Sequence, residues 1–218
     1  MFELDKTNSI ANHFLAELRD KSLQLDTLRF RKNLERIGEI LAYEISKSFK
    51  YSPAHIATPL GAKDISLMTQ NPVLITILRA GLPFHQGFLN VFDKAESGFI
   101  GACRSGEDGN GSFEIITDYI ACPSLEGRDV IIIDPMLATG KSAVAAIQHL
   151  AKFGNPLSLH FAAVIASATG VEYVQRCNPK HKIWVGSIDE TLNSKAYIVP
   201  GLGDAGDLSF GIKLDIAK

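Results

Sequence analysis

The stretch "IIIDPMLATGKSAV" at residues 131–144 decides the fold, because it joins a strand pattern to a helix pattern through a short turn. Its apolar run, which begins at Val130, predicts a buried strand that ends at Asp134. The Gly-Lys-Ser sequence does not form a nucleoside triphosphate P-loop, because Pro135 stands where that motif needs its first glycine. A helix that begins here still offers unpaired N–H groups and a positive dipole end, so the stretch predicts a phosphate-binding loop of another kind.

Apolar runs and helical patterns alternate on both sides of this stretch. Four continuous apolar runs are typical of strands buried on both faces of a parallel sheet: 73–78, 98–103, 129–134 and 157–166. Three further stretches are predicted to be helices: 9–19, 28–48 and 140–153. This alternation predicts an α/β fold with a parallel sheet core flanked by helices and with right-handed crossovers. The length of 218 residues suits one domain, 1–218, with a helical N-terminal part over 1–50.

Composition excludes several classes of function. The net charge of −2, without a basic block, argues against wholesale binding to nucleic acid or to a membrane surface. The six histidines show no metal-binding spacing and no G-x-S-x-G motif is present, so a metalloenzyme or a serine hydrolase has no support. Three cysteines without a C-x-x-C motif, an acidic amphipathic N-terminus and no apolar run of membrane-spanning length predict a cytoplasmic protein.

Two glycine-rich segments interrupt the alternation. The polar segment 103–115 is predicted to be a mobile loop or a hairpin tip, with the composition of a lid. The segment 198–211 is predicted not to be helical, and is either a solvated loop or a backbone wall against a ligand. Ligands of open parallel sheets bind at the carboxyl ends of the strands, where Asp134 and the loop after it lie.

Two candidate groups follow strand ends. Asp134 could accept hydrogen bonds from sugar hydroxyls or help to hold Mg²⁺, while Thr139, Gly140 and Ser142 could donate to a phosphate. A pentose 5-phosphate would use both halves of this motif; the alternative is a helix cap with a solvent-facing aspartate. Arg79 ends the run 73–78 and could bind a pyrophosphate, or could be an ordinary surface cation.

These segments resemble the uracil phosphoribosyltransferases. The motifs that carry the resemblance are "DPMLATGKS" at 134–142, "YIVPGLGDAGD" at 197–207 and "ILRAGL" at 77–82. Asp-Pro at the start of the first motif is typical of the uracil enzymes among phosphoribosyltransferases. Shorter similarities follow in the same order as in the family: "LRDK" at 18–21, "RIGEILAYE" at 36–44, "TPL" at 58–60 and "IDETLN" at 188–193.

The resemblance implies a fold and a reaction. The fold would be that of type I phosphoribosyltransferases, with a parallel sheet core, a flexible loop or hairpin, and a C-terminal hood over the base, here residues 196–218. The reaction would join uracil to the 5-phosphoribosyl group of 5-phosphoribosyl-1-pyrophosphate, giving UMP and pyrophosphate in pyrimidine salvage. Mg²⁺ would be held mainly by the donor's pyrophosphate rather than by protein ligands. Family members form dimers or larger assemblies, and GTP is a candidate activator.

The resemblance also implies roles for individual residues. Asp134, Arg79 and Arg104 would be catalytic. The phosphoribosyl donor would be bound by Arg79, Arg104, Asp134, Pro135, Met136, Leu137, Ala138, Thr139, Gly140, Lys141, Ser142 and Asp204. Uracil would be bound by Ile198, Gly203, Asp204 and Ala205.

The chain departs from the family pattern at three places. Lys141 stands where the family has glycine, Ser105-Gly106 follows Arg104 where the family has Asp-Glu, and Leu208 stands where the family has arginine. These departures keep open an alternative of another class, a non-catalytic or regulatory ligand-binding protein on the same fold. A transferase for a different base is less favoured, because the segment 197–207 is so close to the uracil pattern.

Overall fold

The computed structural model describes residues 1–108 and 112–213, without the side chains of residues 102–118. Within this part of the chain, eight strands form one central sheet in the order β1–β10–β9–β7–β4–β5–β6, with the short β8 paired to β9. The strands are β1 Phe2–Glu3, β4 Val73–Leu78, β5 Glu96–Asp108, β6 Ser112–Ala121, β7 Asp129–Ile133, β8 Met136–Leu137, β9 Ser158–Ser167 and β10 Lys182–Asp189. All pairs in the sheet are parallel except β5–β6.

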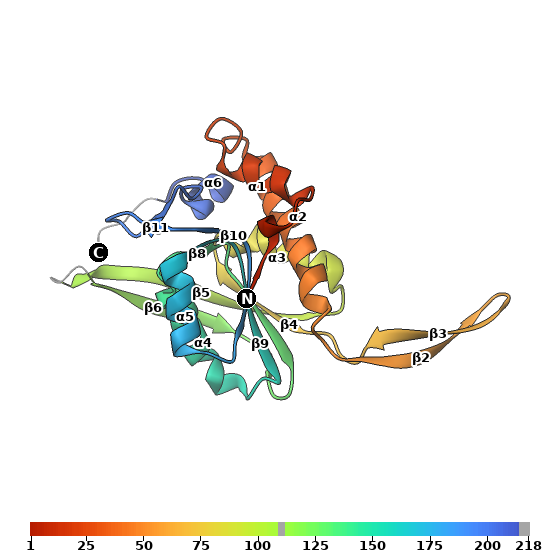
Figure 1. Cartoon of the computed structure of the whole chain (residues 1–218). Helices are drawn as coiled ribbons and strands as arrows, with labels where there is room; N and C mark the ends of the chain where they lie inside the picture. The colour runs from red at the N-terminus through yellow and green to blue at the C-terminus, as the bar shows by residue number, and fades with distance from the viewer. Residues whose placement is uncertain (109–111, 214–218) are drawn as a thin grey trace.

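Helices cover both faces of the sheet (Figure 1). On one face lie α1 Ala11–Arg19, α2 Thr27–Ser46 and α3 Gly81–Val91; on the other lie α4 Lys141–Leu150 and α5 Ala168–Cys177. Alternate residues of β7 enter the two cores: Ile131 and Ile133 pack with the first set of helices, Val130 and Ile132 with the second. This two-sided burial explains the continuous apolar runs and confirms the predicted α/β fold with a mostly parallel sheet.

Two antiparallel hairpins extend from the sheet region. β2 Tyr51–Thr58 pairs with β3 Gly61–Met68 in a separate sheet, and this hairpin projects away from the rest of the molecule (Figure 1). The sequence patterns did not predict it. β5 and β6 form the second hairpin, which confirms the hairpin interpretation of 103–115; residues 109–111 lie outside the described part.

The hood contains a helix that the sequence reading excluded. Short strands β11 Thr191–Leu192 and β12 Ile198–Val199 pair antiparallel and lead to α6 Ala205–Phe210. The prediction that 198–211 is not helical was therefore wrong. Asp204 caps α6 by accepting a hydrogen bond from Asp207 N at 3.0 Å, and Gly211 ends the helix with φ 86°. Only Gly206 lies inside α6, so the glycines mark the ends of this helix rather than prevent it.

Among the helices of residues 1–108 and 112–213, none is both long and apolar enough to cross a bilayer. The longest helix, α2, buries one apolar stripe that includes Phe30, Leu34, Ile37 and Leu41 against the sheet. It therefore behaves as the amphipathic helix expected over 28–48.

Candidate active site

The phosphate loop, residues 134–142, begins where β7 ends. Asp134 is partly buried, and its Oδ1 accepts a hydrogen bond from Met136 N at 3.2 Å. The carbonyl of Pro135 accepts from the N–H groups of Val164 and Ile165, each at 3.0 Å, which fixes the loop to β9. Met136 and Leu137 then form β8 instead of the simple turn that the sequence suggested. The loop is thus held by main-chain bonds and leaves the Asp134 carboxylate at the carboxyl end of the sheet.

The start of α5 contacts the phosphate loop through Ser167, the N-cap of that helix. Ser167 Oγ donates to the carbonyl of Ala138 at 2.5 Å and accepts from Gly170 N at 2.9 Å. Gly140 has φ 76°, and a Cβ atom there would lie 2.8 Å from Gly170 O. Both its conformation and this close approach require glycine. Gly140 therefore fixes the turn immediately before Lys141, the first residue of α4.

The turn after β4 lies beside the phosphate loop. A Cβ atom at Gly81 would be 3.2 Å from the carbonyl of Ile133, the residue before Asp134. Arg79 stands in this turn, is exposed, and follows a cis peptide bond with Leu78. The two parallel strands β4 and β7 thus bring Arg79 and Asp134 to the same edge of the sheet, as the sequence predicted.

The hood packs against the turn after β4, because a Cβ atom at Gly206 would lie 3.8 Å from Ala80 Cβ. Ile198, Leu202 and Ala205 are buried in one apolar cluster with Met136 and Ala138 of the phosphate loop. That cluster also includes Ala80, next to Arg79. Gly203 is exposed, with φ 91°. Three segments far apart in the sequence therefore meet around the turn after β4: that turn, the phosphate loop that follows Ile133, and the hood.

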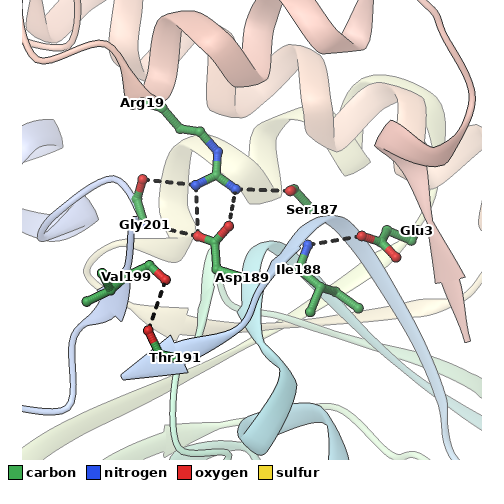
Figure 2. Close-up of polar contacts among 8 residues, drawn as sticks. All are labelled: Glu3, Arg19, Ser187, Ile188, Asp189, Thr191, Val199 and Gly201. Carbon is green, nitrogen blue, oxygen red and sulfur yellow. Dashed lines mark hydrogen bonds and ion pairs between the residues drawn. The ribbon is translucent and has the colours of Figure 1, made fainter. Parts of the chain in front are cut away.

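A partly buried ion pair fixes the hood to α1 and β10 (Figure 2). Arg19 binds Asp189 through both guanidinium nitrogens, at 2.8 and 2.9 Å, and also donates to Ser187 Oγ at 3.0 Å. The carbonyl of Gly201 accepts from Arg19 at 3.1 Å, and Gly201 N donates to Asp189 Oδ2 at 2.9 Å. Figure 2 shows the guanidinium and the carboxylate facing each other between the helix, the strand and the hood. This network places the residues that precede Gly203.

The comparison with protein families agrees with this arrangement. The model of the family described as uracil phosphoribosyltransferase matches residues 6–212. The chain belongs to this family. It is 47% identical to a uracil phosphoribosyltransferase of Porphyromonas gingivalis over 98% of this chain and 99% of that one. It is 38% identical to that of Pyrococcus furiosus, over 90% of this chain and 84% of that one.

A solved structure supports the same fold. The AQ2163 protein from Aquifex aeolicus is 32% identical, with a TM-score of 0.84, and the match covers 97% of this chain and 98% of that one. Together with the family, this similarity confirms the type I phosphoribosyltransferase fold that the resemblance implied. The family match includes all three segments that meet at the candidate site.

Most of the predicted site residues lie in these three segments. Asp134 to Ser142, Arg79 and the hood residues Ile198 to Ala205 come from the three converging segments. Arg104 has its backbone in β5, paired with Ile115, but its side chain lies outside the described part. The sequence reading gave no role to Ser167, Arg19 or Asp189, which position the site. The serine at the N-cap of α5 could have been recognised from the sequence. The ion pair could not, because its two residues are 170 positions apart.

The protein ligands for Mg²⁺ are few. Among the described residues, no group of three or more His, Cys, Asp or Glu side chains is arranged to hold a metal ion. Asp134 supplies one carboxylate at the strand end. Mg²⁺ prefers octahedral oxygen ligands and commonly keeps waters and substrate phosphates in its shell. The residues present therefore fit an ion that arrives bound to a pyrophosphate better than one held in a protein cage.

Two buried histidines are structural rather than reactive. His85 of α3 contacts Thr76 Oγ1 at 2.6 Å and Ser97 Oγ at 3.2 Å. Trp184 Nε1 donates to His160 Nδ1 at 2.9 Å, so the other ring nitrogen of His160 bears the proton and donates to Ser158 Oγ. Burial lowers the pKa of each histidine from 6.5 to about 4. Both are therefore neutral at physiological pH.

Proposed function

We propose that this protein transfers the 5-phosphoribosyl group of 5-phosphoribosyl-1-pyrophosphate to uracil and releases UMP and pyrophosphate. The observation that carries the proposal is the meeting of the turn after β4, the phosphate loop and the hood. The reaction takes place at the anomeric carbon of the ribose. The phosphorylated sugar, the leaving pyrophosphate and the base each need their own contacts around that carbon, and the three segments can provide them. Membership of the uracil phosphoribosyltransferase family supports the same reaction.

The donor is assigned to the phosphate loop and its neighbours. The first N–H groups of α4, with the hydroxyls of Thr139 and Ser142, bind the 5-phosphate at the positive end of the helix dipole. Asp134 accepts hydrogen bonds from the ribose hydroxyls. Arg79 and Arg104 bind the pyrophosphate, and Asp204 faces the ribose. Positive charge grows on the anomeric carbon as pyrophosphate leaves, so the transfer depends on stabilising the departing anion and excluding water.

Uracil is assigned to the main chain of the hood. Uracil presents a ring N–H between two carbonyl oxygens, and a peptide carbonyl flanked by N–H groups complements that edge. Ile198, Gly203 and Ala205 supply main-chain groups here. Cytosine has an acceptor at the same ring nitrogen and an amino group beside it, so its polar groups would face like groups and stay unpaired. The specificity for uracil thus arises without a charged side chain.

Mg²⁺ is proposed as the cofactor, and when bound with the donor it would neutralise charge on the leaving pyrophosphate. The protein's part is to orient that complex through Arg79 and Asp134. Removal of Mg²⁺ with a chelator is expected to stop UMP formation without changing the melting temperature, because the ion is proposed to be held mainly by the donor's pyrophosphate.

The functional form is proposed to be a cytoplasmic homodimer or larger homo-oligomer. The β2–β3 hairpin supports assembly, because it exposes Tyr51, Leu60, Ile65 and Leu67 on a projecting arm. Cys122 and Cys177 are free thiols, which suits a reducing compartment. GTP is included as a candidate activator on the strength of the family resemblance alone.

One assay tests the reaction. The protein is incubated with Mg²⁺, 5-phosphoribosyl-1-pyrophosphate and, separately, uracil, cytosine, hypoxanthine or adenine, with and without GTP. We expect UMP from uracil and no nucleotide from the other bases. Nucleotide formation from a purine would contradict the base assignment. Donor binding without any product would support the non-catalytic alternative instead.

A further inference from the structure

The guanidinium of Arg79 is held by the hood. Its Nη2 donates to Asp207 Oδ1 at 3.0 Å and to the carbonyl of Gly211 at 3.3 Å. Asp207 lies in the first turn of α6, and Gly211 ends that helix. The arginine assigned to the pyrophosphate under the proposed function is therefore paired with a carboxylate of the segment that is assigned to the base. The two residues are 128 positions apart in the sequence.

We propose that Asp207 acts as a positioning residue that holds Arg79 until the donor binds, and that the pyrophosphate then takes its place on the guanidinium. This inference rests on the proposed function. Phosphate oxygens and the Asp207 carboxylate are both acceptors for the Nη2 hydrogens of Arg79, so they compete for that nitrogen. Exchange of the partner removes the ion pair between the turn after β4 and α6. Donor binding thereby breaks one contact between the hood and the rest of the protein before uracil binds.

The exposure of the pair makes this exchange easy. The side chains of Arg79 and Asp207 retain 41% and 28% of their accessible surface. Ion pairs this exposed contribute little, because water and salt screen them. A pyrophosphate carries several negative charges and can bind the fork in two places, so it is the stronger partner. The hood meanwhile keeps its other anchors, since Arg31 donates to the carbonyl of Ser209 at 2.8 Å and Ala205 stays buried.

Pyrophosphate binding separates this role from a structural one. Equilibrium dialysis with labelled pyrophosphate and Mg²⁺ measures the dissociation constant without turnover, at low and at high salt. The proteins compared are the unmodified chain, Asp207→Asn, Arg79→Gln and the double variant. Asp207→Ser serves as a second removal of the carboxylate, and melting curves establish that each variant is folded.

The exchange predicts a gain of affinity when the competitor is removed. Asp207→Asn should bind pyrophosphate up to about fivefold more tightly, which corresponds to about 1 kcal/mol. The gain should shrink at high salt and vanish in the Arg79→Gln background.

Three results would overturn the inference. Equal or weaker binding by both carboxylate variants would show that Asp207 only supports the hood. An equal gain in both backgrounds would show a general charge effect rather than release of Arg79. Failure of the unmodified chain to bind pyrophosphate at all would overturn the proposed function as well, so the two failures are distinct.

Discussion

Asp134 joins the main chain of the phosphate loop to the assigned ribose site. Its carboxylate accepts from Met136 N, so the side chain is oriented by the loop it begins. Asp134→Asn keeps the shape but removes the charge. We expect more than about a tenfold loss of kcat/KM with an unchanged melting temperature, because the carboxylate is assigned to the ribose hydroxyls. Steady-state kinetics of UMP formation measure this; near-normal turnover would refute the role of Asp134.

Lys141 is exposed at the first position of α4, beside the place assigned to the 5-phosphate. The positive φ in this loop belongs to Gly140, so lysine is accommodated at position 141 without backbone strain. Lys141→Gly should weaken donor binding by up to about tenfold, since one partly screened charge contact contributes about 1 kcal/mol.

The salt dependence of donor binding tests the charge of Lys141 directly. The loss should shrink at high salt, and uracil affinity should hardly change. Lys141→Gln controls for the backbone freedom that glycine adds and should show the same loss. Equal donor dissociation constants for Lys141→Gly and the unmodified chain at low salt would leave Lys141 as a solvated surface residue.

At the scale of elements, the hood depends on α1 through Arg19. Arg19→Gln leaves Asp189, which is 8% exposed, without its bidentate partner. Breaking a buried pair costs about 3 kcal/mol, and the hood strand should shift. We expect a lower free energy of unfolding and a raised KM for uracil, measured by urea denaturation and by kinetics. Lys47→Gln breaks the exposed pair with Glu44 and should cost less than about 1 kcal/mol.

The elements predicted from sequence are those whose pattern is set by burial. The strand runs 73–78 and 129–134 match β4 Val73–Leu78 and β7 Asp129–Ile133 closely, because both faces of these strands are covered. The helix expected over 28–48 is α2, whose apolar stripe faces the sheet. The β2–β3 hairpin was missed because its residues are mostly exposed on both faces, which leaves no periodic signal.

The candidate site was predictable where one segment carries the chemistry. The phosphate loop combines a strand end, a turn and a helix start within residues 134–142, so local rules are sufficient. The pairing of Arg79 with Asp207 was not predictable, because it depends on how two distant segments pack. α6 was missed for a related reason: its stability comes from the cap by Asp204 and the burial of Ala205, which outweigh glycine's poor helix propensity.

At the scale of the whole molecule, the β2–β3 hairpin carries apolar side chains that nothing in the described chain covers. Ile65 and Leu67 are each 46% exposed on β3, and the hairpin forms a sheet of its own. Replacing residues 54–65 by a short turn should give a monomer that keeps its fold, measured by light scattering and circular dichroism. Shortening of this kind leaves the three site segments intact. A variant of unchanged oligomeric mass would place the interface elsewhere.

The two buried histidines contribute to the loss of stability in acid. Because the pKa of His85 and of His160 is lowered from 6.5 to about 4, the unfolded chain binds protons in this range that the folded chain does not. Stability should therefore fall as the pH drops from about 6.5 to about 4, by at most about 1.4 kcal/mol per pH unit for each histidine. Above that range their contribution is constant.

Urea denaturation between about pH 4.5 and about pH 6 measures how steeply the free energy of unfolding changes with pH. His85→Gln should reduce this slope, whatever the substitution does to stability at neutral pH. Replacement of the exposed His13 by glutamine controls for the loss of an imidazole. An unchanged slope in His85→Gln would mean that His85 is not a source of the acid sensitivity.

The pair of Arg19 with Asp189 also fixes the order in which the protein can be completed on the ribosome. Its two residues are 170 positions apart, so at about 5 to 20 residues per second the arginine emerges roughly 10 to 30 s before its partner. β1 likewise cannot pair with β10 until β10 has been synthesised. A nascent chain that already carries the phosphate loop therefore still lacks the hood, the segment assigned to uracil under the proposed function.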